Sequence, residues 1–155
     1  MIYLAVDPGK ATGVAWFTSE LSFRSYIMDV PRYEVEHFVD MAVTKYAPDI
    51  TVIIESWEVR KNTAELSSQL DPRYIIGAVE YICRKTAVPY HEQTAGQMKS
   101  FAHRKRNDSH KVTALGWYKP GEGHDNDAAS HLVTFLATDR SPTGDWMRQR
   151  LSEVL

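Results

Sequence analysis

The nine residues Tyr3–Ala11 read YLAVDPGKA and decide how the chain begins to fold. An apolar run ends at Asp7, and Pro8 and Gly9 follow at once, a pair that favours a turn. Residues 12–17, TGVAWF, then have the pattern of a second strand, so the sequence predicts a β-hairpin. A carboxylate at the end of a buried strand is costly unless it has a partner or a metal ion, but Asp7 could equally serve only to cap the turn.

The hydrophobic pattern after this hairpin predicts an α/β domain. Apolar residues in 33–46 recur at steps of three and four, which is typical of an amphipathic helix, and the β-branched run ITVII at 50–54 is typical of a central strand. No linker is long enough to divide the chain, so we expect one domain over residues 1–155. The further elements expected are strands over 21–30 and from Val88, and helices over 62–70, 72–86 and 95–103 (capped by Thr94), after Ser109, from Asp125 or Asn126 to Thr138, and over 145–155.

Composition excludes several classes of protein. The chain has 155 residues, of which 43% are hydrophobic and 25% charged, as in ordinary globular proteins. It has no run of about 18 apolar residues, so no membrane partner is expected. Its start lacks the features of a secretory signal, and its single cysteine, Cys83, excludes an internal disulfide framework and a Cys-only zinc site. We therefore expect a cytoplasmic protein in which Cys83 is a packed thiol.

The charge distribution is uneven along the chain. A net charge of −2 argues against a generic polyanion binder, but basic residues gather in one short stretch. Such a stretch could be a nucleic-acid-binding face or a solvated loop. Its basic residues are Lys99, Arg104, Lys105, Arg106 and Lys111.

Acidic residues occupy three comparable places. Asp7 ends the first strand, Glu55 ends the 50–54 strand, and the segment HDND at 124–127 opens a late helix. If the two strands are neighbours, Asp7 and Glu55 emerge side by side, and His124 and Asp127 share a helix face because they are three residues apart. Carboxylates gathered in this way repel one another unless a divalent cation neutralises them. Alternatively, Glu55 is a solvated strand end, Asp125 only an N-cap and His124 an ordinary loop residue.

These segments together resemble the RuvC family of Holliday-junction resolvases. The shared features are VDPG, a second strand containing Gly, a strand ending in Glu, and a late H-x-x-D-A, and they extend from Ile2 to about Ala137. The stretches TAGQMKSF and DSHKVTALG resemble that family's Q-V-K…K-x-x-V segment. The resemblance implies an RNase H-like fold, with a mixed central sheet flanked by helices. Sugar kinases and actin-like ATPases also open with Asp-x-Gly on a strand, but the chain is too short for their paired lobes.

The resemblance also implies a metal-dependent site. Asp7, Glu55 and Asp127 match the family's carboxylates, His124 stands where members carry Asp or His, and Asp125 could supply or replace that ligand. Two Mg²⁺ or Mn²⁺ ions per site are implied. One, between Asp7 and Asp127 or His124, would activate a water, and the second, between Asp7 and Glu55, would stabilise the leaving 3′ oxygen.

The implied partner is branched DNA, especially a four-way junction. Lys99, Arg104, Lys105, Arg106 and Lys111 would position its phosphates. Paired cuts in a two-fold symmetric junction imply a homodimer. The apolar stripe of helix 72–86 is the candidate interface, but an ordinary core-facing helix is an equally good interpretation.

Other interpretations remain open at this point. The region after Glu55, SWEVRKNTAELSSQLDPRY, departs from the family pattern, so whether Trp57 acts as the family's wedge at the junction centre is undecided. The chain could be a related nuclease acting on flaps or forks, or a non-catalytic junction-binding module. Its short connections are compatible with a phage-encoded member.

Overall fold

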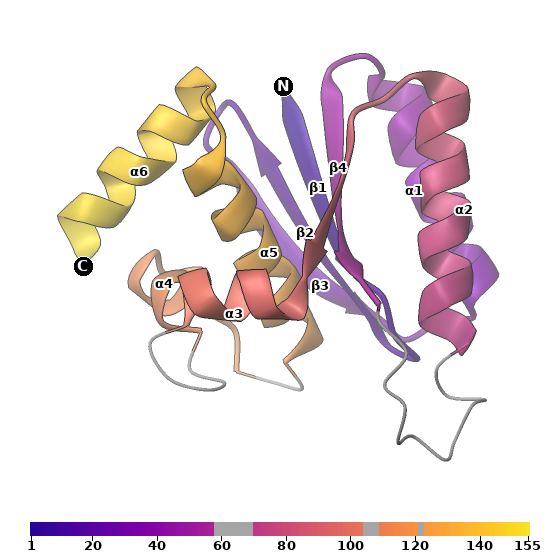
Figure 1. Ribbon diagram of the computed structural model, residues 1–155, viewed down its shortest axis with the longest axis horizontal. Helices are drawn as coiled ribbons and strands as arrows, with labels where there is room; N and C mark the ends of the chain where they lie inside the picture. The colour runs from indigo at the N-terminus through magenta and orange to yellow at the C-terminus, as the bar shows by residue number, and fades with distance from the viewer. Residues whose placement is uncertain (58–69, 104–108, 121–122) are drawn as a thin grey trace.

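The computed structural model describes residues 1–57, 70–103, 109–120 and 123–155, and in them a five-stranded sheet lies between two groups of helices (Figure 1). The predicted helix over 62–70 falls, apart from its last residue, outside the described residues. None of the helices in the described ranges is both long and apolar enough to cross a membrane. The strands are β1 (Ile2–Asp7), β2 (Thr12–Thr18), β3 (Phe23–Met28), β4 (Ile50–Ser56) and β5 (Tyr90–Thr94). The helices are α1 (Arg32–Tyr46), α2 (Leu70–Thr86), α3 (Ala95–Ala102), α4 (His110–Ala114), α5 (His124–Thr138) and α6 (Pro142–Val154).

The sheet is mixed, with strand order β3-β2-β1-β4-β5. β1, β2 and β3 pair antiparallel, which confirms the predicted hairpin at the start of the chain. β1 pairs parallel with β4, and β4 pairs parallel with β5. The first strand and the 50–54 strand are therefore neighbours, which is the condition on which the convergence of Asp7 and Glu55 depended.

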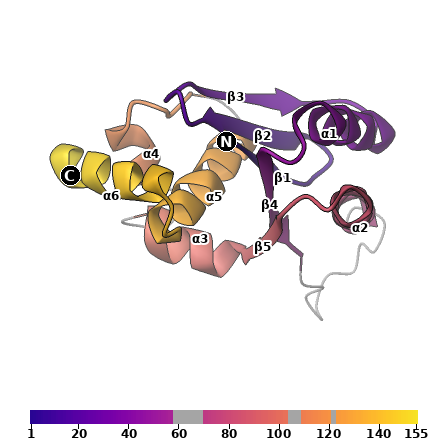
Figure 2. The same ribbon diagram turned by 90° about the horizontal axis from the view of Figure 1, so that it is seen from above.

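The central strands bury both faces, because successive side chains of a strand point to opposite sides. Leu4 and Val6 of β1 pack toward α1 and α2, whereas Tyr3 and Ala5 pack toward α5. Figure 2 shows α1 and α2 on one side of the sheet, with α3, α5 and α6 on the other. This alternation decides which side of the sheet each strand-end residue faces.

The apolar stripe of α2 belongs to the core. Ile75, Val79 and Cys83 are fully buried against α1 and the sheet, so the core-facing interpretation of this helix is the one the structure supports. Burial raises the pKa of the Cys83 thiol to about 11, as expected of a packed thiol. The helix begins at Leu70, two residues before the predicted start.

Two helix starts differ from the sequence-based expectation. Neither Asp125 nor Asn126 caps α5. The helix begins at His124, after Gly123 in a left-handed conformation with φ of 98°. Similarly, Ser141 and Pro142 do not lie in a break before the tail helix but start α6, where the Ser141 hydroxyl accepts a hydrogen bond from the backbone N–H of Gly144 at 3.2 Å.

Other boundaries agree more closely. Thr94 caps α3 as predicted: its hydroxyl accepts from the backbone N–H of Gln97 at 3.1 Å, and the Gln97 side chain accepts in return from the Thr94 N–H at 2.8 Å. The strand expected from Val88 begins at Tyr90, and the strand expected over 21–30 is limited to β3.

Candidate active site

Asp7 and Glu55 come together because their strands are parallel neighbours. The register aligns Val6 with Ile54, so the next residues along the two strands are Asp7 and Glu55. Both follow the alternation of Ala5 and therefore face α5. Asp7 is buried with a side-chain exposure of 10%, and Glu55 is partly buried at 15%. The predicted convergence of two carboxylates at one sheet edge is present in the structure.

A glycine lets α5 reach this edge. Gly13 pairs with Asp7 across the hairpin, and a Cβ placed at Gly13 would lie 1.9 Å from the carbonyl oxygen of His124. Only a residue without a side chain permits this approach. The first turn of α5 therefore packs directly on β2, and Nδ1 of His124 lies 2.9 Å from Oδ2 of Asp7.

Asp127 lies three residues after His124 on the same face of α5 and is the third carboxylate of the site. Burial raises the pKa of Asp127, the positive charge of Lys99 opposes this, and the negative charge of Glu55 adds to it. Asp7 is also affected by the charge of Asp127. Three carboxylates from β1, β4 and α5 thus act on one another within one site.

The pKa values of the two strand-end carboxyl groups are shifted in opposite directions. Burial raises the pKa of Asp7 to about 6, against a lowering by its hydrogen bond with His124, and the neighbouring Glu55 raises it further. For Glu55, burial acts to raise the pKa, but hydrogen bonds from His131 and Asp7 outweigh it, so the pKa is lowered. Asp7 therefore keeps its proton to a higher pH than Glu55, as expected when two carboxyl groups interact.

The Asp125 side chain forms its hydrogen bond within its own helix. It is buried at 5% exposure, and its Oδ1 accepts a hydrogen bond from the backbone N–H of Asn126 at 2.9 Å. This hydrogen bond is local to α5, whereas His124 contacts Asp7 directly. Of the two predicted candidates for the fourth ligand, the geometry favours His124.

The predicted basic residues are only partly described. Arg104, Lys105 and Arg106 lie outside the described residues. Lys99 is exposed on α3 and acts electrostatically on both Glu55 and Asp127. Lys111 on α4 is partly buried, with Nζ 3.3 Å from the centroid of the Phe101 ring, and burial lowers its pKa. Of the two predicted cations that the structure describes, Lys99 is the one whose charge acts on the carboxylates.

Sequence reasoning missed two polar residues behind Glu55. His131 on α5 is fully buried, and its Nε2 lies 3.0 Å from Oε2 of Glu55. The side-chain amide of Gln93 lies 3.0 Å from Nδ1 of the same ring. The sequence held two signals. His131 lies four residues after Asp127, so the two share a face of the helix, and Gln93 lies two residues after His91, so the two point to the same side of the strand.

The donor chemistry of the site fits a hard divalent cation. Carboxylate oxygens are the ligands that Mg²⁺ and Mn²⁺ prefer, and an imidazole is an acceptable fourth donor. In the described part of the chain, however, no three His, Cys, Asp or Glu side chains are grouped closely enough to define a metal site as they stand. The residue types fit the cation, whereas their arrangement does not by itself define a coordination sphere.

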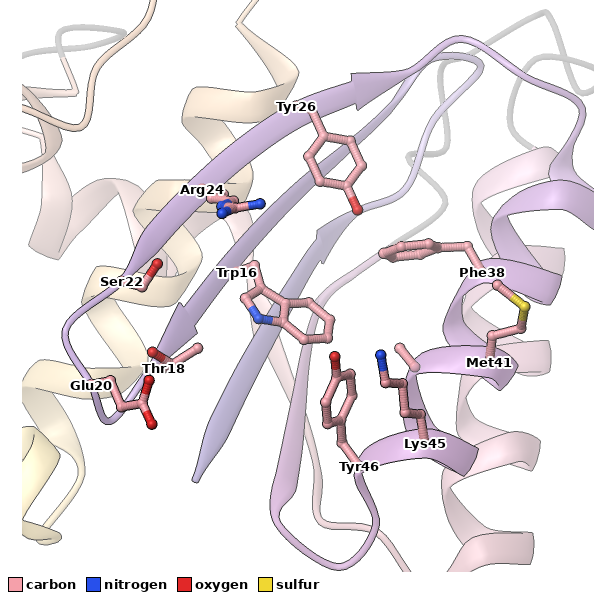
Figure 3. Close-up of a pocket in the computed structure, with 11 residues that line it drawn as sticks. Trp16, Thr18, Glu20, Ser22, Arg24, Tyr26, Phe38, Met41, Lys45 and Tyr46 are labelled. Carbon is pink, nitrogen blue, oxygen red and sulfur yellow. The ribbon is translucent and has the colours of Figure 1, made fainter.

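A separate groove lies away from this site. It has a volume of about 480 Å³ and runs between β2, β3 and α1, with Trp16, Tyr26, Phe38 and Tyr46 among its lining residues (Figure 3). None of the clustered carboxylates lines it. We therefore locate the candidate active site by its charged groups and not by this hollow.

The mixed sheet order and the flanking helices define the RNase H-like fold, in the form found in RuvC-like resolvases. No protein-family model matches the sequence, and no curated protein matches it. Solved structures do match. RuvC of Thermus thermophilus is 18% identical, with 86% of this chain and 92% of that chain covered and a TM-score of 0.61.

Two further solved structures show the same similarity. T. thermophilus RuvC in complex with Holliday junction substrate is 15% identical over the same shares of the two chains, with a TM-score of 0.65. The yeast mitochondrial Holliday junction resolvase Ydc2 is 12% identical, with 97% of this chain and 80% of that chain covered and a TM-score of 0.53. These matches confirm the predicted fold class and give the suggested phage origin no support.

Proposed function

We propose that this chain is a divalent-metal-dependent endonuclease that resolves four-way (Holliday) DNA junctions. The observation that carries the proposal is the convergence of Asp7, Glu55 and Asp127, with His124, at one edge of the sheet. A group of mutually repelling, partly buried carboxylates is the kind of site that a hard cation stabilises. The fold is shared with RuvC, which has been solved in complex with a Holliday junction substrate.

In this proposal Asp7, Glu55, Asp127 and His124 would hold two Mg²⁺ or Mn²⁺ ions. When bound, the ions supply activation of the attacking water and charge stabilisation of the leaving 3′ oxygen, so that the products carry 5′ phosphates. Asp7, 10% exposed at the centre of the group, must lose its proton to act as a ligand. His124 keeps the Asp7 carboxylate oriented through its 2.9 Å contact.

The DNA would approach from the side of Lys99. This exposed cation is close enough to Glu55 and Asp127 to affect both carboxyl groups, so a phosphate at the site would be paired with it. Lys111 would contribute less, because its ammonium group already packs on Phe101. Binding that depends on phosphate contacts falls as salt concentration rises.

A homodimer with two sites would match the two-fold symmetry of a four-way junction. The apolar stripe of α2 cannot form the interface, since it is buried in the core. An interface on this helix would use its outer side chains, of which Tyr74 and Tyr81 are 52% and 66% exposed. Sedimentation of the purified protein tests this part of the proposal.

The test of the nuclease function is cleavage of a synthetic four-way junction in Mg²⁺ or Mn²⁺. We expect wild type to cut, and Asp7→Asn and Glu55→Gln to bind the junction but lose at least about 100-fold in rate, because each loses several kcal/mol of charge stabilisation. Asp40→Asn, an exposed aspartate on α1, is the matched control and should cut normally.

Other outcomes discriminate between the remaining functions. Faster cutting of flaps or forks than of junctions would assign the same chemistry to another branched substrate. Junction binding by wild type without cutting in either metal would identify a non-catalytic binding module. Full activity in Asp7→Asn would contradict its role as a ligand.

A further inference from the structure

A fully buried histidine lies directly behind the candidate site. His131 is on α5, one turn beyond Asp127, and has no exposed surface. Its Nε2 is 3.0 Å from Oε2 of Glu55, and its Nδ1 is 3.0 Å from the side-chain amide of Gln93. Both contacts follow from the sheet, because β4 and β5 are parallel neighbours whose register sets Glu55 opposite Gln93.

Only one orientation of the Gln93 side-chain amide gives every neighbouring polar atom a suitable hydrogen-bond partner. In that orientation its nitrogen donates to Nδ1 of His131 at 3.0 Å and to the backbone carbonyl of His131 at 3.1 Å, while its oxygen accepts from the backbone N–H of Phe135 at 3.3 Å. Since Nδ1 of His131 then accepts a hydrogen bond, the ring proton of the neutral imidazole is on Nε2. Nε2–H therefore donates to Glu55.

We propose that His131, held by Gln93, is a positioning residue that fixes the Glu55 carboxylate for metal binding. The inference rests on the proposed nuclease function. The hydrogen bond from Nε2 engages Oε2 of Glu55, so it fixes the carboxylate without using Oε1. Groups that orient a metal-binding carboxylate in this way commonly change metal affinity or activity by about 10- to 100-fold when removed.

The alternative is that His131 only fills space in the core. Its neighbours Leu132 and Val133 are fully buried apolar residues. A leucine at position 131 would fill a similar space without burying polar nitrogens, which cost free energy unless they are paired. What the imidazole provides beyond packing is therefore the connection between Gln93 and Glu55.

The experiment compares variants that keep or remove the donor to Glu55. In His131→Gln the amide nitrogen reaches the Nε2 position, in His131→Asn the shorter side chain reaches only the Nδ1 position, and His131→Leu has no donor. The first readout is Mn²⁺ affinity, measured by calorimetry on the DNA-free protein. The second is the KM and kcat of junction cleavage. Denaturant unfolding checks that each variant is folded.

We expect His131→Leu and His131→Asn to lose about 10- to 100-fold in Mn²⁺ affinity and in kcat, with an unchanged KM for the junction. His131→Gln should stay within about threefold of wild type, because the donor is retained. Gln93→Leu should fall between them, since it releases the ring without deleting it. A space-filling role predicts the opposite order, with His131→Leu close to wild type, and that result would overturn the inference. If His131→Leu does not fold, the comparison of Asn with Gln decides the question.

The outcome also separates this inference from the proposed function. If wild type cuts junctions and the variants bind Mn²⁺ and cut as well as wild type, the positioning role is wrong and the nuclease assignment stands. If wild type cuts no branched substrate but loses Mn²⁺ binding in His131→Leu, the positioning role stands and the nuclease assignment is wrong. Nitrogen NMR of the ring provides a third check, because a ring that lacks a proton on Nε2 in wild type would overturn the inference in either case.

Discussion

Replacing Asp7 by Asn should make the metal-free protein more stable at neutral pH. The pKa of Asp7 is raised from its ordinary value of 3.8 to about 6, mainly by burial. A carboxyl group with a raised pKa binds its proton more tightly in the folded than in the unfolded state. Its contribution to stability is therefore favourable at low pH and is lost as pH rises through the interval from 3.8 to about 6. A shift of this size corresponds to a cost of up to about 3 kcal/mol once Asp7 is ionised.

The measurement is urea unfolding of wild type and Asp7→Asn in EDTA at several pH values. Glu55 has a lowered pKa, so above about pH 5 it is ionised in both states. Asp127, whose pKa burial raises, is present in wild type and in the variant, so its contribution largely cancels in the difference between them. Between about pH 5 and 7.5 the difference between wild type and Asp7→Asn should therefore report Asp7, and it should grow by about 1.5 kcal/mol in favour of the variant. Asp40→Asn should show no such change, because Asp40 is exposed on α1.

Adding Mg²⁺ or Mn²⁺ at neutral pH should reverse the order of the two proteins. A ligand present at about 100 times its dissociation constant stabilises the folded state by about 2.7 kcal/mol, and only wild type keeps the Asp7 carboxylate that we propose as a metal ligand. A difference between wild type and Asp7→Asn that stays constant over this pH range would refute the reasoning, because it would mean that Asp7 is ionised at its ordinary pKa despite its burial.

Three further predictions follow from single contacts. Gly13→Ala should destabilise the fold by at least about 2 kcal/mol and abolish cleavage, because its Cβ would lie 1.9 Å from the carbonyl oxygen of His124. Gly77→Ala on α2 is the matched control, because an added Cβ there would meet nothing within 4 Å outside its own helical turn, and it should stabilise by about 0.5–1 kcal/mol; equal effects at both glycines would contradict the close approach of α5. Lys99→Gln should weaken junction binding and reduce by about one the slope of log affinity against log salt, measured by fluorescence anisotropy, and an unchanged slope would exclude a phosphate contact. Cys83 should react with a thiol reagent at about pH 8 only as fast as the protein unfolds, since burial raises its pKa to about 11, and rapid labelling of folded protein would show that α2 is not packed as described.

Local patterns in the sequence predicted most of the secondary structure. The apolar run of β1 and the steps of three and four in α1 depend on neighbours within a few residues, so they can be recognised without a structure. The capping box at Thr94 is local for the same reason. Where local signals failed, as at the start of α5, tertiary contact outweighed capping preference: the approach of His124 to Gly13 sets the first turn, and no side chain caps it.

The placement of acidic residues at strand ends and a helix start, together with the resemblance to a known family, supplied the candidate site residues, and the structure supplied the reason they meet. Sequence spacing shows that Asp7 and Glu55 end two strands but not that these strands are parallel neighbours in register. His124 is 117 positions from Asp7, a separation that no periodicity can bridge. The contact between them depends on how α5 packs against the sheet.

The sequence by itself determined the elements, the hairpin turn and the chemical types of the candidate ligands, because these depend on short-range preferences of the backbone. Only the tertiary structure decided that α2 turns its stripe into the core, that Asp125 bonds to its own helix, and that His131 connects Gln93 to Glu55. The physical reason is that the burial of a polar or apolar group is decided by elements distant along the chain, whose arrangement minimises the exposed apolar area of the molecule as a whole.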